Sequence, residues 1–479
     1  MRVRMMSMVV ALSAVAGAAF AGDNPPWAPS LMAFEHYDSE RTKLFEQAHF
    51  AGALAGANTV DVRVSPDTYP TPYNTVFLSR RSLFVFGGAY GGDPGATGSF
   101  VARIDPETLQ TVWFNQLINT VETNEWNYPG VLSALQDRRL YLIYGYRLAK
   151  LDAQDGRVLG TLELPSLAAP RDTSYNGLDG WPDGTLVAKS VYRQAGCEVQ
   201  GFAAFLQCPN PADVPKSVVV AIDPRTLKVI DQVVAPEFIG GRITATVFEG
   251  HNYVYLTGQT TVFRYIYQDG RLTQDTSWNP GTVVLPGQSG PTAVSVMNDW
   301  VVFATNAVAA ATPLSVVAIN QTDASRQFST QPFAAVGSPQ SWSLSAITVD
   351  PLRSRIFTAD SLAGEVAALE LRDDGLHNVW TAQQRTSEFL ALIDQAQRRV
   401  LVGTDVPPGE PIGANTHDWV VWRNADTGDE IARSSLLPEF STGTMVQPAY
   451  AGHMYYLALD GTFIELRAHP TSEISAAGN

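Results

Sequence analysis

Eight polar residues recur along the chain at intervals of about fifty residues, each just ahead of a predicted β-strand. They are Asn74, Asn127, Asn176, Arg242, Thr292, Ser343, Glu388 and Thr444. If the strands converge on one axis, these side chains form a ring with one cation and one anion. Such a ring could bind a hydrophilic ligand or a hydrated cation, and it could equally line a water-filled channel. We therefore predict an axial ligand site, with the channel as the alternative.

Other sequence signals of catalysis are missing. The chain has no G-x-S-x-G elbow, no Walker loop and no G-x-G-x-x-G motif between a strand and a helix. Its seven histidines show no zinc-type spacing. Because no nucleophile–base pair stands out, chemistry at the ring would have to come from a bound metal or quinone.

The elements that would position the ring are strands joined by a repeated hairpin. An apolar strand, an Asp or Asn and a turn recur at Asp105, Asp152, Asp223, Asn320 and Asn424. A period near fifty residues is typical of propeller blades rather than of helical repeats. We expect an all-β chain that forms a single β-propeller of eight four-stranded blades, with seven blades as the alternative.

Eight repeat units can be assigned along the sequence. They cover residues 72–115, 127–165, 174–236, 241–280, 289–335, 342–383, 387–437 and 443–470. The last unit lacks a good final strand. Residues Asn58–Ser65 could supply it, which would close the ring and remove an exposed sheet edge.

The hairpin repeat resembles the blade signature of the quinoprotein-like propellers, Ala-x-Asp-x-x-x-Gly-Lys-x-x-Trp. The matching residues, blade by blade, are Asp105 and Trp113, Asp152 and Gly156, Ala221, Asp223 and Lys228, and Asn424 and Gly428. This eight-bladed family includes the PQQ-dependent alcohol dehydrogenases. The resemblance implies a propeller, and it makes calcium and PQQ the cofactors to consider. Only Trp113 falls at the position where the family docks a Trp ring between blades.

The chain departs from the catalytic members of that family. Those members carry two adjacent cysteines over the cofactor, whereas this chain has only Cys197 and Cys208. It also lacks the Cys-x-x-Cys-His motif of an electron-acceptor domain, and no residues match the calcium ligands of the family. The resemblance therefore predicts the fold and leaves the activity open.

A second, local resemblance lies in the third unit. The segment Tyr175–Lys189 is similar to the Asn-Gly-Leu…Asp-Gly stretch of the calcium-dependent lactonases and arylesterases of the gluconolactonase type. There the Asn ligates an axial metal, so the resemblance implies Asn176 as a metal ligand. Those proteins have six blades, and Asn-Gly and Asp-Gly are also ordinary turn sequences.

The third unit is about twenty residues longer than the others, and the excess, Ser190–Lys216, carries both cysteines. We expect a Cys197–Cys208 disulfide, with two free thiols as the alternative. The insertion either caps the axial site or is a surface loop pinned by the disulfide. Lys189 and Arg193 flank it, either as anion binders or as ordinary surface cations.

The N-terminus predicts export. Residues 1–21 have the charged start, apolar stretch and Ala-x-Ala end of a signal peptide cleaved after Ala21, so we expect a periplasmic or secreted protein. No later run approaches eighteen apolar residues, which predicts no membrane span in the mature chain. Residues 22–55 would form an extension with a short helix over Ser39–Leu54, and residues 56–479 the propeller. The net charge of −15, without basic clusters, argues against nucleic acid as a partner.

Two functions remain open from the sequence. In the first, the propeller binds a small organic molecule at the axial mouth and, with calcium or PQQ, transforms it as an oxidoreductase or hydrolase. In the second, it is a non-catalytic scaffold that binds another envelope protein. A deep polar pocket would favour the first, and a broad apolar patch on one face would favour the second.

Overall fold

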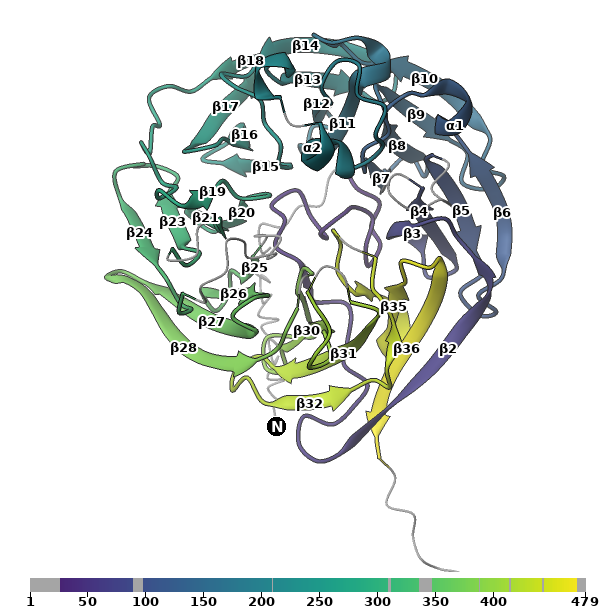
Figure 1. The fold of residues 1–479 in the computed structure, drawn as a ribbon, viewed down its shortest axis with the longest axis vertical. Coiled ribbons are helices and arrows are strands. Elements are labelled where there is room, and N and C mark those ends of the chain that lie inside the picture. Colours follow the sequence, from purple (N-terminus) through teal and green to yellow (C-terminus); the bar gives the residue numbers. More distant parts are fainter. Residues whose placement is uncertain are drawn as a thin grey trace, which may run out of the picture.

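The computed structural model describes residues 26–88, 98–208, 210–308, 312–335, 347–386, 388–412, 415–441 and 443–471. Eight sheets are arranged around a central axis in a closed ring (Figure 1). Each blade has four antiparallel strands, in chain order from the axis outward in seven blades, while the eighth takes its outermost strand from the N-terminal part of the chain; this confirms the predicted eight-bladed all-β propeller. The predicted signal peptide, residues 1–21, lies outside the described residues.

The first four blades follow one another without interruption. Their strands are β3 (Pro72–Ser79), β4 (Ser82–Gly87), β5 (Phe100–Ile104) and β6 (Thr111–Gln116); β7 (Val131–Ala134), β8 (Leu140–Tyr144), β9 (Arg147–Leu151) and β10 (Val158–Glu163); β11 (Thr173–Gly180), β12 (Leu186–Tyr192), β13 (Val218–Asp223) and β14 (Lys228–Val234); and β15 (Ile243–Phe248), β16 (His251–Thr257), β17 (Val262–Gln268) and β18 (Arg271–Gln274).

The last four blades complete the ring. Their strands are β20 (Ser295–Met297), β21 (Trp300–Ala304), β23 (Val316–Asn320) and β24 (Gln327–Thr330); β25 (Thr348–Asp350), β26 (Arg355–Asp360), β27 (Glu365–Arg372) and β28 (Gly375–Gln383); β29 (Ala391–Ile393), β30 (Val400–Asp405), β31 (His417–Asn424) and β32 (Glu430–Arg433); and β34 (Gln447–Pro448), β35 (His453–Leu457), β36 (Thr462–Pro470) and β2 (Asn58–Thr68).

A few short elements complete the structure. Strands β1 (Leu44–Phe45) and β33 (Leu437–Pro438) pair with β29 and β31 of blade 7. Outside the blade sheets lie the pair β19 (Gln288–Ser289) and β22 (Asn306–Ala307), the helices α1 (Thr120–Thr123) and α2 (Ala203–Gln207), and 3₁₀ turns at Pro170–Asp172, Pro211–Asp213 and Tyr450–Gly452. In the described part of the chain, no helix is long and apolar enough to cross a membrane.

The burial of each strand follows its place in the blade. The second strands are mostly apolar and buried, because a strand inside a blade is covered on both faces; Leu140–Tyr144 is buried at every position. Outermost strands alternate between half-buried and exposed residues, as β14 does over Lys228–Val234. The apolar core therefore lies between neighbouring blades.

The ring closes as the sequence predicted. Strand β2 pairs antiparallel with β36, with Asn58 opposite Pro470 and Val64 opposite Ile464. Figure 1 shows these two strands, from opposite ends of the chain, side by side. Closure leaves the eighth blade with an outer strand supplied by the N-terminal part of the chain, and a hydrogen-bonded seam between the chain's two ends.

Tryptophans dock neighbouring blades against glycine turns. A Cβ on Gly156 would lie 2.6 Å from the Trp113 ring, so the Trp of blade 1 packs directly on the turn of blade 2. The same contact joins blades 6 and 7, where a Cβ on Gly428 would lie 2.7 Å from Trp380. We did not anticipate Trp380, because it pairs with Ala368, twelve residues earlier, whereas Trp113 pairs with Arg103, ten residues earlier, so Trp380 lies outside the spacing of the repeat signature.

The prediction of a short helix over Ser39–Leu54 is wrong. Residues 27–50, here called the axial segment, instead run irregularly along the propeller axis (purple in Figure 1). Their carbonyls accept hydrogen bonds from inner-strand amides, including Phe77 N to Met32 O (2.7 Å) and Leu392 N to Lys43 O (2.9 Å). A helix would keep those carbonyls for itself and leave the strand amides unpaired, which is costly in a buried site.

Candidate ligand cavity at the axial mouth

A cavity of about 630 Å³ lies at one end of the axis, where the inner strands begin. Its residues come from the starts of inner strands, from the turns between blades and from the blade 3 insertion, residues 193–217. They are Tyr73, Tyr128, Pro129, Asn176, Phe202, Ala203, Phe205, Leu206, Phe238, Gly240, Gly241, Arg242, Thr257, Gly258, Gln259, Gly290, Pro291, Thr292, Phe389, Glu439, Gly443 and Leu459. We call this the axial cavity. Its lining is mainly aromatic and apolar.

Two β-bulges aim side chains into the cavity. The register of β3 against β4 shifts between Pro72 and Asn74, so Tyr73 is the extra residue in that strand. The register of β11 against β12 shifts in the same way on either side of Asn176. A bulge turns its extra residue away from the regular alternation of the strand. Tyr73 and Asn176 thereby join the cavity lining instead of packing between blades.

The predicted ring residues divide into two groups in the structure. Asn176, Arg242 and Thr292 line the axial cavity. Four others lie directly beside lining residues in the sequence: Asn74, Asn127, Glu388 and Thr444 are next to Tyr73, Tyr128, Phe389 and Gly443. Ser343 falls outside the described residues. The sequence thus located the mouth to within one residue, while ligand binding by the ring itself stays a prediction.

The neighbouring ring residues support the mouth from behind. The Glu388 carboxylate accepts hydrogen bonds from the backbone amides of Gly443 (2.9 Å) and Thr444 (3.4 Å). The Asn127 side chain accepts a hydrogen bond from Ser99 Oγ (3.1 Å). These contacts hold the inner-strand starts in place around the cavity.

The cavity floor rests on a buried charge cluster. Arg242 Nη2 lies 3.0 Å from Glu35 Oε1 and 2.5 Å from the Tyr73 hydroxyl, and Arg41 Nη1 lies 3.1 Å from the other Glu35 oxygen. Glu35 belongs to the axial segment, so that segment supplies the counter-charge for the lining arginine. Burial, with Glu35 in addition, raises the pKa of Tyr73, which stays a neutral hydroxyl. Burial alone would lower the pKa of Arg242, but its interactions with Glu35 and Tyr73 outweigh burial and raise the pKa above its ordinary value.

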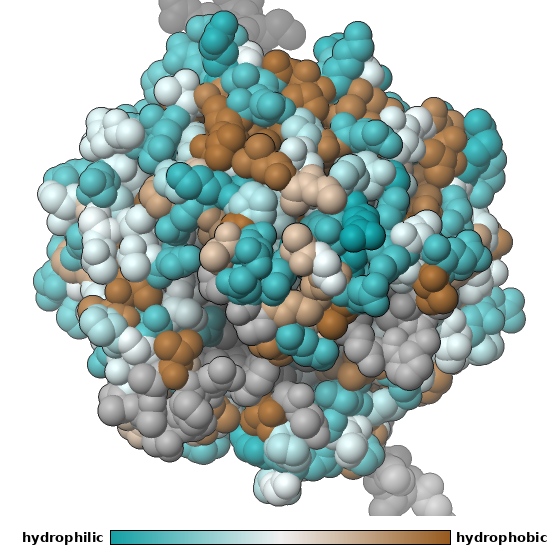
Figure 2. Space-filling model, turned by 45° about the horizontal axis from the view of Figure 1, so that its top comes forward, coloured by the Kyte–Doolittle hydropathy of each residue, from teal (hydrophilic) through white to brown (hydrophobic). Residues whose placement is uncertain are grey.

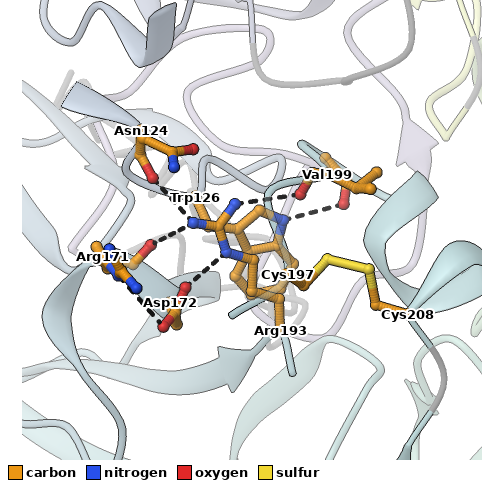
Figure 3. Close-up of a disulfide and its surroundings, with 9 residues drawn as sticks. Asn124, Trp126, Arg171, Asp172, Arg193, Cys197, Val199 and Cys208 are labelled. Atoms are coloured by element: carbon orange, nitrogen blue, oxygen red, sulfur yellow. Dashed lines mark hydrogen bonds and ion pairs between the residues drawn. A yellow bond between two sulfur atoms is a disulfide. The ribbon is translucent and has the colours of Figure 1, made fainter. Parts of the chain in front are cut away.

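The blade 3 insertion covers one side of the cavity. Its α2 places Phe202, Phe205 and Leu206 on the lining, directly before the cysteine that ends the helix. The predicted Cys197–Cys208 disulfide is present and closes this loop (Figure 3). Of the two interpretations of the insertion, the structure supports the cap over the axial mouth.

Arg193 anchors the insertion from below. Its guanidinium bonds Asp172 Oδ1 (2.8 Å) and the carbonyls of Val199 (3.2 Å) and Asn124 (2.8 Å), as Figure 3 shows. Lys189 is also buried, and its Nζ donates to Ile239 O at 2.5 Å. Burial and the nearby Arg242 charge lower the pKa of Lys189 well below its usual value. The sequence interpretations of Arg193 and Lys189 as surface cations or anion binders are therefore wrong.

Aromatic contacts fix the insertion to blade 2. The Phe205 ring packs against Trp126 at a centroid distance of 5.4 Å and against Tyr128 at 5.3 Å. Trp126 Nε1 donates to Gly201 O (3.1 Å), which ties the base of α2 to the same ring (Figure 3). Each aromatic pair contributes about 1 kcal/mol beyond its buried area. The cap is thus a packed part of the fold.

Two lining residues offer buried polar atoms without a partner in the described structure, Asn176 Oδ1 and Thr257 Oγ1. The Asn176 amide donates to Gly240 O at 2.9 Å, which orients its oxygen. A buried acceptor left without a partner costs about 1–3 kcal/mol. Both atoms are closed to solvent in this structure, so a ligand donor reaches them only when neighbouring side chains shift.

The lining residues do not fit the calcium and PQQ site of the quinoprotein enzymes. A calcium ion takes six to eight oxygen ligands, usually several of them carboxylates. The described lining has one carboxylate, Glu439, besides the single free oxygen of Asn176. Across the described residues, no group of three or more His, Cys, Asp or Glu side chains could hold a metal ion. We derive no step through either cofactor.

The aromatic lining residues Tyr73, Tyr128, Phe205 and Phe389 were not predicted from the sequence. Three of them are direct neighbours of predicted ring residues, and the bulge at Tyr73 explains the shift of one place. For Phe205 the available signal was the aromatic and apolar run Phe202–Leu206 between the two cysteines. An aromatic and apolar run in a loop indicates that the loop packs over an apolar surface or a binding site.

Neither a family model nor a curated protein matches this sequence. Among solved structures, the quinohemoprotein alcohol dehydrogenase of Comamonas testosteroni is similar over 96% of this chain and 83% of its own, with a TM-score of 0.59 and 10% identity. The corresponding enzyme ADHIIG of Pseudomonas putida HK5 is similar over 94% and 81%, with a TM-score of 0.54 and 10% identity. A europium-containing methanol dehydrogenase matches over 90% and 88%, with a TM-score of 0.52 and 8% identity. This chain therefore has the eight-bladed propeller fold of the quinoprotein dehydrogenases, as the hairpin repeat predicted.

Proposed function

We propose that this protein is exported and binds a small, mainly apolar organic molecule that carries a hydrogen-bond donor, in the axial cavity beneath α2. The observation that carries the proposal is the cavity itself: about 630 Å³, with aromatic and apolar walls and a few polar side chains, among them Asn176 and Thr257. Pockets of this size and composition are typical of small-molecule sites.

The charge balance of the cavity favours an uncharged ligand. Arg242 is the one cation among the described lining residues, and Glu35 pairs with it at 3.0 Å from below. A ligand anion would have to compete with the buried Glu35 carboxylate for the Arg242 guanidinium. An aromatic alcohol or amide needs no such exchange, since its ring can pack on the aromatic walls while its donor meets a polar residue of the lining.

Export is supported by two independent features. The first is the signal-peptide pattern of residues 1–21. The second is the Cys197–Cys208 disulfide, because such bonds persist in oxidising compartments. In a periplasmic or secreted location, the disulfide that closes the cap over the cavity would stay oxidised.

The structural neighbours are named as alcohol and methanol dehydrogenases, which raises the question of chemistry at this site. A redox or hydrolytic reaction would need a cofactor, and the described lining lacks the oxygen ligands of the quinoprotein centre. The function we propose is therefore ligand binding. The scaffold alternative expects one broad apolar face, whereas the face in Figure 2 carries several separate apolar groups among hydrophilic residues.

Fluorescence titration with 2-naphthol, an uncharged aromatic alcohol, tests the proposal. Leu206 lines the cavity but is 56% exposed, so Leu206→Arg should fold normally and obstruct the site. Leu352→Arg, at a residue 52% exposed and outside the cavity lining, is the matched control. We expect saturable binding by the wild type and Leu352→Arg and at least tenfold weaker binding by Leu206→Arg. Equal binding by all three proteins would refute the proposal.

A further inference from the structure

A second hollow, of about 730 Å³, lies at the seam where the ring closes. It is lined by residues of β2, β3, β35 and β36 and by three turns. They are Asp61, Val62, Arg63, Phe77, Arg80, Arg81, Pro106, Glu107, Tyr450, Ala451, His453, Tyr455, Glu465 and Arg467. We call it the seam cleft.

The seam cleft is at the opposite end of the propeller from the axial cavity. Strand β3 connects the two: Tyr73, near its start, lines the axial cavity, and Arg80 follows its last residue, Ser79. Eight residues of β-strand span about 23 Å at 3.3 Å per residue. The two hollows are separated by this length of β3, and they have no lining residue in common.

The composition of the seam cleft is unusual for this chain. The protein carries 47 acidic residues against 32 lysines and arginines, yet in this one hollow four arginines outnumber the three carboxylates, Asp61, Glu107 and Glu465. The arginines come from distant positions, Arg63 on β2, Arg80 and Arg81 on the β3–β4 turn, and Arg467 on β36. Only closure of the ring brings them together. Neighbouring positive charges repel one another, and an anionic ligand would relieve this repulsion.

Arg63 is fixed in place by its own contacts. Its guanidinium donates to the carbonyls of Glu107 (2.5 Å) and Pro106 (3.0 Å) and lies 2.9 Å from Glu465 Oε1. His453 Nδ1 lies 3.1 Å from the same oxygen. Although burial opposes it, His453 and Arg63 together lower the pKa of Glu465. Arg63 and Glu465 thus form an ion pair within the cleft wall, and Arg63 is already engaged by it.

The other three arginines have no such partner. In the part of the chain that the structure describes, no carboxylate is within ion-pair distance of Arg80, Arg81 or Arg467. Asp61 faces Arg467 across the β2–β36 ladder, but its carboxylate pairs with His469 at 3.2 Å. Three guanidinium groups are therefore available to a ligand from two sides of the cleft.

The base of the cleft is rigid and aromatic. The Phe77 ring packs against Tyr450 and Tyr455 at centroid distances of 5.1 and 6.2 Å. The Tyr450 hydroxyl accepts a hydrogen bond from Leu31 N (2.9 Å) of the axial segment. A guanidinium is a planar donor that binds phosphate or carboxylate oxygens in pairs, and it gains most from this on a preorganised surface.

We propose that the seam cleft binds a small anion with at least two phosphate or carboxylate groups, held by Arg80 and Arg81 on blade 1 and by Arg467 on blade 8. The spread of the three guanidinium groups over two blades requires more than one anionic group. Such a ligand bridges the first blade and the last one, and the last blade is itself closed by the hydrogen bonds between β2 and β36. Binding to the closed ring alone stabilises it by mass action.

Isothermal titration calorimetry on the full protein tests this with pyrophosphate and citrate, and with acetate as the singly charged reference. The ionic strength is held constant, because exposed charges are screened by salt. We expect pyrophosphate or citrate to bind the wild type and to raise its melting temperature by several degrees. The Arg80→Gln/Arg81→Gln double variant and Arg467→Gln should each bind at least tenfold more weakly.

The matched control is Arg157→Gln/Arg225→Gln, which removes two charges from side chains 67% and 85% exposed on blades 2 and 3. It should keep wild-type affinity within twofold. Pyrophosphate binding without citrate binding identifies a phosphate ligand, and the reverse identifies a carboxylate. Equal weakening in the control, or no binding of either anion above acetate, overturns the proposal. Titration of the arginine variants with 2-naphthol keeps this outcome separate from the axial cavity.

Discussion

Glu35 lies 3.0 Å from Arg242 across the boundary between the axial segment and blade 4, and both side chains are almost completely buried. The pair makes the floor of the axial cavity depend on a segment that precedes the propeller in the chain. Glu35 already occupies the lining arginine, which is why we assign an uncharged ligand to the cavity. The same carboxylate pairs with Arg41, so two buried cations share one acidic residue.

Glu35→Gln should therefore be strongly destabilising. The substitution keeps the shape of the side chain but leaves Arg41 and Arg242 buried without a counter-charge, which costs about 3 kcal/mol or more. Urea unfolding measures the change. Glu122→Gln, on exposed α1, is the control and should stay within about 0.5 kcal/mol of the wild type. A Glu35→Gln protein as stable as this control would show that the buried pair is not needed.

Removing the disulfide should loosen the cap. The Cys197→Ser/Cys208→Ser double variant loses a cross-link over a separation of 11 residues, worth on the order of 3 kcal/mol in the loop-entropy account. Because Phe202, Phe205 and Leu206 lie between the two cysteines, the affinity for 2-naphthol should fall several-fold. Lower stability with unchanged affinity would contradict the role of the cap in binding.

Blade docking can be tested at Gly156. Its φ of +74° disfavours any other residue, and a Cβ would also push into the Trp113 ring. Gly184 has a φ of +87° but open space around it, so Gly184→Ala measures the backbone cost alone, about 1 kcal/mol. Gly156→Ala should cost roughly 1–2 kcal/mol more than Gly184→Ala in urea unfolding. Equal losses would mean that the tryptophan contact contributes nothing.

The axial segment should make stability depend on pH. Burial, with the nearby Asp38 carboxylate, raises the pKa of Glu40 to about 8, whereas an unfolded Glu titrates near 4.3. Between these values the folded protein keeps a proton that the unfolded chain releases. Stability contributed by Glu40 is therefore present at low pH and is lost as the pH rises toward 8, at up to about 1.4 kcal/mol per pH unit.

Unfolding measured between pH 5 and pH 7 checks this. Burial raises the pKa of Asp179 to about 8 as well, so the wild type should lose stability across this range. Glu40→Gln keeps the oxygen that accepts from Thr246 Oγ1 (2.6 Å) and should show a shallower loss. Glu249→Gln, in an exposed turn, should retain the wild-type slope. Identical slopes in all three proteins would contradict the assignment.

Much of the fold could be predicted because its signals are local. The Asp side chain of each hairpin bonds amides two or three residues ahead, as Asp105 does with Glu107 at 2.7 Å and Asp223 with Arg225 at 2.9 Å. Such turns need only neighbouring residues, so their repeat is visible in the sequence. The blade count and the closing strand follow from that repeat.

The errors arise where tertiary contacts override local preference. The spacing of Phe45, His49 and Ala53 resembles one face of a helix, but the inner strands offer unpaired amides along the axis, and an extended segment satisfies them. The four arginines of the seam cleft are scattered from position 63 to position 467, so no sequence window contains them. Bulges, as at Tyr73, shift lining residues by one place without a clear sequence signal.

Native mass spectrometry of the mature protein, purified from its own cells beside Leu206→Arg and Leu352→Arg, tests the central claim most directly. We predict that the wild type and Leu352→Arg carry the same bound small molecule, which Leu206→Arg lacks. Three proteins of identical, ligand-free mass, or the same bound mass in Leu206→Arg, would contradict a ligand in the axial cavity.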